Sequence, residues 1–150
     1  MNFSPTRFSA LAVAAVLTLS ATLPATAATA TAPFNVTASL TSKCEVTAGP
    51  TDVAFTYTSF QTTAATATGG AFSVRCTNTL PYTLSLSATT GTVIGLAYTI
   101  SVPSATFTGA GLTTAAYTVT GSMSAGQSGT CATSTAACTG TSAQTLTVTY

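Results

Sequence analysis

Residues 70–86 read GAFSVRCTNTLPYTLSL, and this stretch decides the fold class. Apolar and polar residues alternate from Ala71 to Cys76 and again from Tyr82 to Leu86, which is the pattern of strands with one buried face. The intervening TNTLP carries residue types that favour turns. The stretch therefore predicts two successive β-strands, over 71–76 and 82–86, joined by a turn.

The same alternation recurs along the rest of the chain. It predicts further strands over 34–40, 53–57, 94–102, 115–123 and 146–150. Helix signals are nearly absent beyond the N-terminal apolar run, and the Gly/Ser/Thr-rich stretch 124–143 predicts a long loop. Short strands separated by Gly and Pro are typical of a β-sandwich, so we predict a single all-β domain.

The N-terminus predicts export. Arg7 precedes an apolar run over 8–23, Pro24 breaks the run, and small residues follow. This layout is that of a secretory signal peptide over 1–27, with cleavage between 27 and 30. A transmembrane anchor is the alternative, but the run is short for a spanning helix and no basic stop-transfer cluster follows it. About 120 residues then remain, which is the size of one domain.

Charge is scarce after the signal peptide. The charged residues there are Lys43, Glu45, Asp52 and Arg75, which cancel. The chain therefore has no basic face for nucleic acid. A neutral surface also resists self-association poorly, so we expect this protein to function in an assembly.

All four cysteines lie after the signal peptide. An even number in an exported chain predicts two disulfides, and four cysteines allow three pairings. The closeness of Cys131 and Cys138 in a turn-rich stretch favours Cys131–Cys138 together with Cys44–Cys76. A zinc site is the alternative, and it lacks both histidine and the Cys-x-x-Cys spacing.

The residues that carry catalysis are few. The chain has no histidine, the commonest general base. Its only carboxylates are Glu45 and Asp52, which a paired-carboxylate hydrolase would need but which we interpret as solvated residues near strand ends. We therefore predict no enzyme, no catalytic residue, no metal and no cofactor.

The two ends of the exported chain are more informative. Phe34, Val36, Ala38 and Leu40 alternate just after the signal peptide. They predict either the first strand of the domain's own sheet or a strand donated to the sheet of a neighbour. At the other end, the strand 146–150 is apolar and uncharged. If it lies at a sheet edge, it needs a partner strand.

Three stretches of the chain resemble a known family: FNVTASLTSKCEV at 34–46, residues 70–86, and QTLTVTY at 144–150. Together they are similar to the spore coat protein U domain family, whose members include subunits of archaic (Csu-type) chaperone–usher pili. The resemblance implies an immunoglobulin-like β-sandwich that lacks its final strand and is completed by donor-strand complementation. A periplasmic chaperone would fill the gap in transit, and an outer-membrane usher would exchange it for the N-terminal strand of the next subunit at the cell surface.

The resemblance also implies roles for residues. Residues 28–42 would form the donor segment, with Phe34, Val36, Ala38 and Leu40 as its buried side chains, and 43–150 the incomplete pilin domain. The acceptor groove would be edged by Val46 on one side and by Leu146, Val148 and Tyr150 on the other. The Cys44–Cys76 bond would match a disulfide of the family, and the partners would be identical or related pilin subunits.

Two functions from different classes follow. The first is a structural pilin-like subunit of a surface fibre, for adhesion and biofilm formation. The second is a self-contained exported β-sandwich that binds a surface or a carbohydrate. The second hypothesis predicts that strand 34–40 pairs within its own sheet, whereas the first predicts that it does not.

Overall fold

The computed structural model describes residues 27–150, so the predicted signal peptide lies outside the described residues but for Ala27. The chain divides into two units, Met1–Ala38 and Ser39–Tyr150. Over 27–43 the structure has neither helix nor strand, so the segment 34–40 does not form a strand in a sheet of its own chain. Among the described residues, no helix is long and apolar enough to cross a bilayer.

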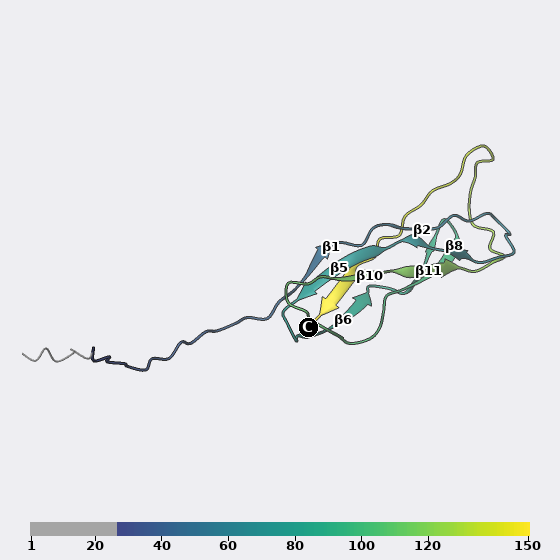
Figure 1. Ribbon diagram of the computed structural model, residues 1–150. Helices are drawn as coiled ribbons and strands as arrows, with labels where there is room; N and C mark the ends of the chain where they lie inside the picture. Colours follow the sequence, from purple (N-terminus) through teal and green to yellow (C-terminus); the bar gives the residue numbers. More distant parts are fainter. Residues whose placement is uncertain (1–26) are drawn as a thin grey trace, which may run out of the picture. The chain divides into compact units, whose positions relative to one another are not determined.

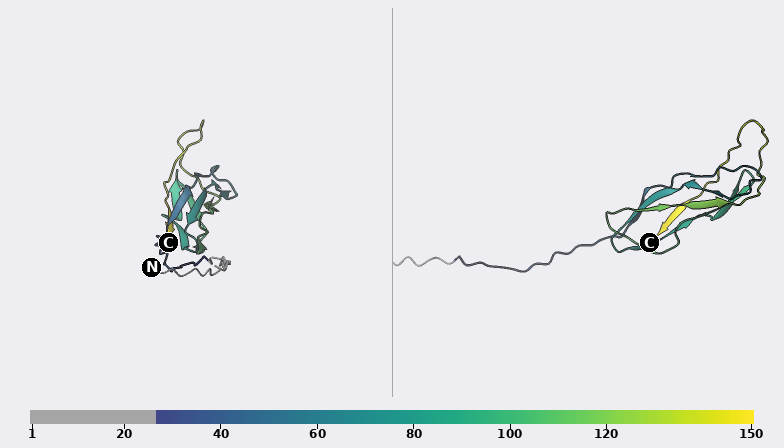
Figure 2. Two further views of the ribbon diagram at one scale, coloured as in Figure 1. Left: turned by 60° about the vertical axis from the view of Figure 1, so that its left-hand side comes forward. Right: turned by 45° about the vertical axis from the view of Figure 1, so that its right-hand side comes forward.

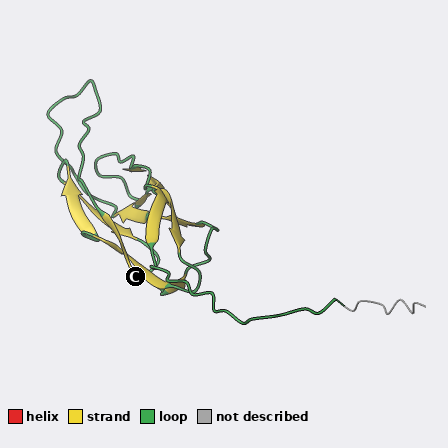
Figure 3. Ribbon diagram, turned by 90° about the vertical axis from the view of Figure 1, so that its left-hand side faces the viewer, coloured by secondary structure: helices red, strands yellow, loops and turns green. Residues whose placement is uncertain are grey.

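Every regular element in the described part of the second unit is a β-strand (Figure 3). The strands are β1 (Cys44–Ala48), β2 (Val53–Ala54), β3 (Ala65–Thr66), β4 (Thr68–Gly69), β5 (Ala71–Cys76), β6 (Pro81–Leu86), β7 (Thr90–Val93), β8 (Leu96–Ser101), β9 (Phe107–Thr108), β10 (Ala115–Thr118), β11 (Thr120–Met123) and β12 (Leu146–Thr149). The all-β fold class is therefore confirmed. The immunoglobulin-like arrangement with a missing strand stays a prediction.

The strands form several antiparallel sheets. Two have three strands each, in the orders β1-β5-β10 and β12-β6-β9, and a third has the order β3-β11-β8-β7. β2 and β4 form a separate pair. Figure 1 shows β5 beside β1 and β10, and β12 beside β6. Each of the two predicted strands within 70–86 thus becomes the middle strand of a three-stranded sheet.

One apolar core joins these sheets. The alternation in 70–86 buries Phe72, Val74 and Cys76 of β5 and Tyr82 and Leu84 of β6. Contacts between the three-stranded sheets include the rings of Phe107 and Tyr117, whose centroids lie 4.8 Å apart, and the hydroxyls of Tyr82 and Tyr117, which lie 2.6 Å apart. Burial, together with the hydrogen bond to Tyr82, raises the pKa of Tyr117.

The predicted strand 115–123 is divided in the structure, because it changes sheets. β10 pairs with β5, and β11 pairs with β8. Between them Val119 is buried, and its N–H donates to the carbonyl of Gly70 at 2.9 Å. Gly70 has φ +78°, and a Cβ there would lie 2.6 Å from the Val119 carbonyl oxygen. Only glycine allows the two backbones to cross this closely.

Other predicted strands differ at their ends. The strand predicted over 53–57 is limited to β2, and the one over 94–102 shortens to β8 because Ile94 and Gly95 have positive φ and turn the chain. Alternation did not predict β3, β4, β7 or β9, and a strand at β1 was expected only from the family resemblance, through Val46. Three of these have two residues each, which is too short for alternation to appear.

Both disulfides have the expected pairing, Cys44–Cys76 and Cys131–Cys138. The first joins directly opposite residues of β1 and β5. The second closes a loop within the long connection from β11 to β12, which has no strand, as predicted. In Figure 2, as in Figure 1, this connection (yellow-green) extends away from the strands. The pairing of Cys44 with Cys76 thus ties the first strand of the domain to the middle strand of its sheet.

The turn over residues 57–61, called the Phe60 turn below, has an unusual backbone. Phe60 has φ +64° and a side chain that is 72% exposed. Bulky residues rarely adopt positive φ, and the strain costs about 1–3 kcal/mol. The turn holds this conformation because its backbone is bonded on both sides: the Phe60 N–H donates to Gln127 O at 2.8 Å, and the Gly126 N–H donates to Gln61 O at 2.8 Å.

Candidate functional site: two unpaired strand edges

The first and last strands of the domain are both sheet edges. Within residues 27–150, β1 is hydrogen-bonded to β5 alone, and β12 to β6 alone. Cα atoms of β1 and β12 approach within 8 Å of one another, yet the two strands form no ladder. Each strand therefore presents unpaired N–H and C=O groups along its outer edge.

The apolar core is incompletely covered along this line. Val46 has the same orientation as the buried Cys44 two residues before it, because side chains alternate along a strand, yet Val46 is 42% exposed. Leu146 and Val148 of β12 contact the core but are only half-buried. Tyr150, which continues their side of the strand, is 59% exposed. We call the surface formed by Val46, Leu146, Val148 and Tyr150 along these two unpaired edges the edge groove.

The four residues predicted to edge an acceptor groove lie on these two strands or directly beside them. Val46 lies on β1, Leu146 and Val148 lie on β12, and Tyr150 directly follows β12. They belong to neighbouring strand edges although about 100 residues separate them in sequence. Their apolar character and partial exposure make the edge groove suited to a further apolar strand.

The electrostatics of the groove are nearly neutral. Glu45 is the only charged residue within β1, and β12 has none. Lys43 Nζ donates to Glu45 Oε2 at 2.8 Å, and Arg75 Nε donates to Glu45 Oε1 at 3.0 Å. These hydrogen bonds, from Lys43 first and then Arg75, lower the pKa of Glu45. The carboxylate is thereby satisfied within its own sheet, and β12 lacks the charges and prolines that protect edge strands from pairing.

The predicted donor residues are apolar and almost fully exposed. Phe34, Val36 and Leu40 are 85%, 85% and 82% exposed, and Ala38 is exposed as well. Isolated exposed apolar residues are common, but four in strict alternation would line one face of a strand. Fully extended, residues 34–40 would span about 20 Å, which is longer than either β1 or β12. The segment could therefore cover the whole edge groove of a sheet.

The chemistry available at the edge groove is strand addition. Backbone groups on both edges can pair with an incoming strand, and apolar side chains can enter between them. In residues 27–150 no group of three or more His, Cys, Asp or Glu side chains is arranged to hold a metal ion.

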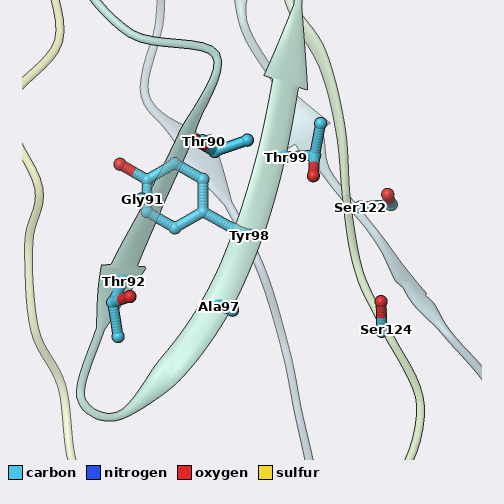
Figure 4. A pocket seen from close by; sticks show the side chains of 8 residues that line it. All are labelled: Thr90, Gly91, Thr92, Ala97, Tyr98, Thr99, Ser122 and Ser124. Carbon is cyan, nitrogen blue, oxygen red and sulfur yellow. The ribbon is translucent and has the colours of Figure 1, made fainter.

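A second surface feature escaped the sequence analysis. A hollow of about 350 Å³ lies over β7, β8 and β11 and is lined by Thr90, Gly91, Thr92, Ala97, Tyr98, Thr99, Ser122 and Ser124 (Figure 4). Thr66, Ser122, Thr99 and Thr90 are in register across the four-stranded sheet, and all are exposed. Hydroxyl residues at alternating positions of one strand, as in Thr90 and Thr92, were the signal that could have revealed a hydroxyl-rich face.

Comparisons with profiles of known families, with curated proteins and with solved structures found no match to this chain.

Proposed function

We propose that this protein is an exported, non-catalytic structural subunit that assembles into a surface fibre by donor-strand complementation. Residues 34–40 of one copy would occupy the edge groove of another. One observation carries the proposal: core-facing residues on two unpaired strand edges are left uncovered, while an alternating apolar segment of the same chain is exposed. In this proposal the domain is an immunoglobulin-like sandwich lacking its final strand.

The energetics suit such an assembly. Burying Phe34, Val36 and Leu40 would contribute about 5–9 kcal/mol. Each backbone hydrogen bond to a strand edge would add about 0.5–1.5 kcal/mol net. Because the donor segment is covalently part of the next subunit, each subunit joins its neighbour head to tail, and the series does not close.

The resemblance to the spore coat protein U domain family supports the same proposal and supplies the remaining partners. A periplasmic chaperone would cover the edge groove before assembly, and an outer-membrane usher would direct the exchange. The fibre would lie at the cell surface and serve adhesion and biofilm formation. Its subunits would be identical or related chains.

The first test removes the donor segment. The full exported chain and a variant lacking residues 28–40 are produced in the periplasm and compared by size exclusion and on denaturing gels without boiling. We expect a ladder of assemblies from the full chain and none from the variant. A stable monomer from the full chain, together with an unfolded variant, would contradict the proposal.

A matched pair of substitutions sharpens this test. Val36→Asp places a charge among the four residues that would enter the groove, whereas Thr37→Asp places it on the opposite side of the same strand. We expect Val36→Asp to abolish the ladder and Thr37→Asp to preserve it. Equal loss in both variants would mean that alternation in the segment has no role.

The hydroxyl-lined hollow over β7, β8 and β11 favours a second candidate, a self-contained module that binds a polysaccharide surface. Exposed hydroxyls in register across strands can hydrogen-bond to sugar hydroxyls. This candidate predicts a stable monomer that is retained on an insoluble polysaccharide and loses retention on Thr99→Val. The absence of a strand over 34–40 in the described chain favours the fibre subunit instead.

A further inference from the structure

Two large apolar side chains, Phe60 and Leu112, are exposed at opposite ends of the domain. Leu112 is 89% exposed in a turn over residues 109–113, called the Leu112 turn below. This turn lies at the end where the chain enters the domain: the Gly111 N–H donates to Cys76 O at 3.1 Å, and the Thr77 N–H donates to Lys43 O at 2.9 Å. The Phe60 turn instead bonds residues that follow β11. β10 and β11 run between the two ends (Figure 1).

The Phe60 turn is built rigidly around an exposed side chain. Five hydrogen bonds tie it to residues 124–128, including Tyr57 Oη to Ser124 O at 2.8 Å and Ser59 Oγ to Ser128 O at 2.6 Å. At φ +64° glycine would be the residue without strain. The phenyl ring is 72% exposed and is absent from the side chains that pack on the core. Folding of the single chain therefore gives no reason for phenylalanine here.

The chain entering the domain is anchored close to the donor residues. The Lys43 N–H donates to Thr77 Oγ1 at 2.8 Å, and the Lys43 carbonyl accepts from the Thr77 N–H. Three peptide units separate Leu40 from Lys43, so their Cα atoms lie at most about 11 Å apart. The end of the domain where the chain enters, which carries Lys43 and the Leu112 turn, is called the Lys43 end below. If residues 34–40 lie in a neighbour's edge groove, the Lys43 end of the donating subunit must therefore lie next to the place where the donor strand leaves that groove.

The direction of the strand decides where it leaves. β12 runs toward the Lys43 end, since Thr149 pairs with Thr83 near the start of β6. A donor strand parallel to β12 would leave at that same end, where the acceptor's own residues 41–43 also leave. The donor strand and the acceptor's own N-terminal segment would then occupy the same space, and the ends of the two subunits would overlap. A donor strand antiparallel to β12 leaves toward the opposite end of the domain, where the Phe60 turn lies.

We propose that in the fibre the Phe60 turn of one subunit packs against the Leu112 turn of the next subunit. This inference rests on the proposed function and specifies the contact between successive subunits. Both turns are uncharged, with the sequences YTSFQ at 57–61 and GAGLT at 109–113. Joining them buries two apolar side chains and places no charge in the contact.

The test is a photo-crosslink within assembled fibres. Phe60 is replaced by the photo-crosslinking amino acid p-benzoylphenylalanine, fibres of the full chain are irradiated, and the crosslinked peptides are mapped by mass spectrometry. We expect crosslinks between position 60 and residues 109–113 of another subunit. The same amino acid at Thr99, an exposed position on the outer face of β8, is the control and should not give this crosslink.

The outcomes separate this inference from the proposed function. Fibres whose position 60 crosslinks elsewhere, or not at all, would overturn the contact and leave the fibre proposal standing. A parent chain that forms no fibre would overturn both.

A second variant tests the same contact without a probe. Phe60→Gly removes the ring and suits the positive φ, so the monomer should melt at an equal or higher temperature. The unboiled ladder should persist because the donor segment is unchanged, while the persistence length of the fibres in electron micrographs should fall. An unchanged persistence length in Phe60→Gly and in Leu112→Ser would overturn the inference.

Discussion

The strands within residues 70–86 and the two strands of the edge groove share one sequence pattern but differ in burial. Inward residues of β5 are almost fully covered, with Phe72 at 2% and Val74 at 1% exposure. Inward residues at the groove are not, with Val46 at 42% and Tyr150 at 59%. β5 has a strand on each side, whereas β1 and β12 each have one. Alternation therefore specifies a strand and its inward face, but the neighbouring strands decide how much that face is covered.

The largest effect should come from truncating a covered residue. Phe72→Ala leaves a cavity between β5 and the facing sheet and should lower the free energy of unfolding by about 3–5 kcal/mol. Val46→Ala removes atoms that are already accessible and should lower it by about 1 kcal/mol or less. Urea unfolding of both variants measures the difference. Similar losses would mean that the edge groove is as well packed as the middle of the sheet.

The next effect should come from supplying the missing cover. A peptide of residues 28–42, added to the variant lacking 28–40, should bind the edge groove and raise the melting temperature. At a peptide concentration of about 100 Kd, the gain is about 2.7 kcal/mol. The matched peptide carrying Val36→Asp should give no gain. Equal stabilisation by both peptides would mean that the uncovered residues do not bind the apolar face of the donor segment.

The smallest effects should come from pH, and they separate the two regions. Because the folded state raises the pKa of Tyr117, the unfolded chain loses this proton first, near pH 10. The free energy of unfolding should therefore fall as the pH rises above about 10. Tyr117→Phe should flatten this decline, and a variant that keeps the full decline would exclude Tyr117 as its source.

At the edge strand β1, the free energy of unfolding should depend on acidic rather than alkaline pH. Hydrogen bonds from Lys43 and Arg75 hold the pKa of Glu45 low in the folded state, so below about pH 4 the unfolded chain binds more protons. The free energy of unfolding should fall slightly as the pH drops through that range. Glu45→Gln should remove this part of the decline in urea titrations at low pH.

The sequence could predict the strands whose pattern is long enough to be seen. Residues 71–76 and 82–86 were located closely, and the pairing Cys44–Cys76 with Cys131–Cys138 was the one found. The strands β3, β4 and β9 could not be predicted, because a strand of two residues is too short to show alternation. The positive φ of Ile94, which ends the predicted strand 94–102 early, is set by the fold rather than by residue type.

The residues of the candidate site could be predicted from the sequence, but their strand pairing and their exposure could not. Alternation at 34–40 predicts a strand with one apolar face. The sequence of a single chain leaves open whether this strand pairs within its own domain or with another subunit. The structure has no strand there. Likewise, the partial exposure of Val46 depends on the sheet order that places β1 and β12 at edges. Exposure follows from tertiary neighbours, which no local pattern encodes.

The disulfide at the start of β1 has a mechanical consequence. A pull on the N-terminal segment reaches the domain at Lys43, and the next residue, Cys44, is covalently bonded to Cys76 at the end of β5. The force therefore bypasses the hydrogen bonds of β1 and loads β5, the middle strand of its sheet, along its length. β1 cannot be peeled away bond by bond from this end. Under tension, the domain must yield as a whole or hold.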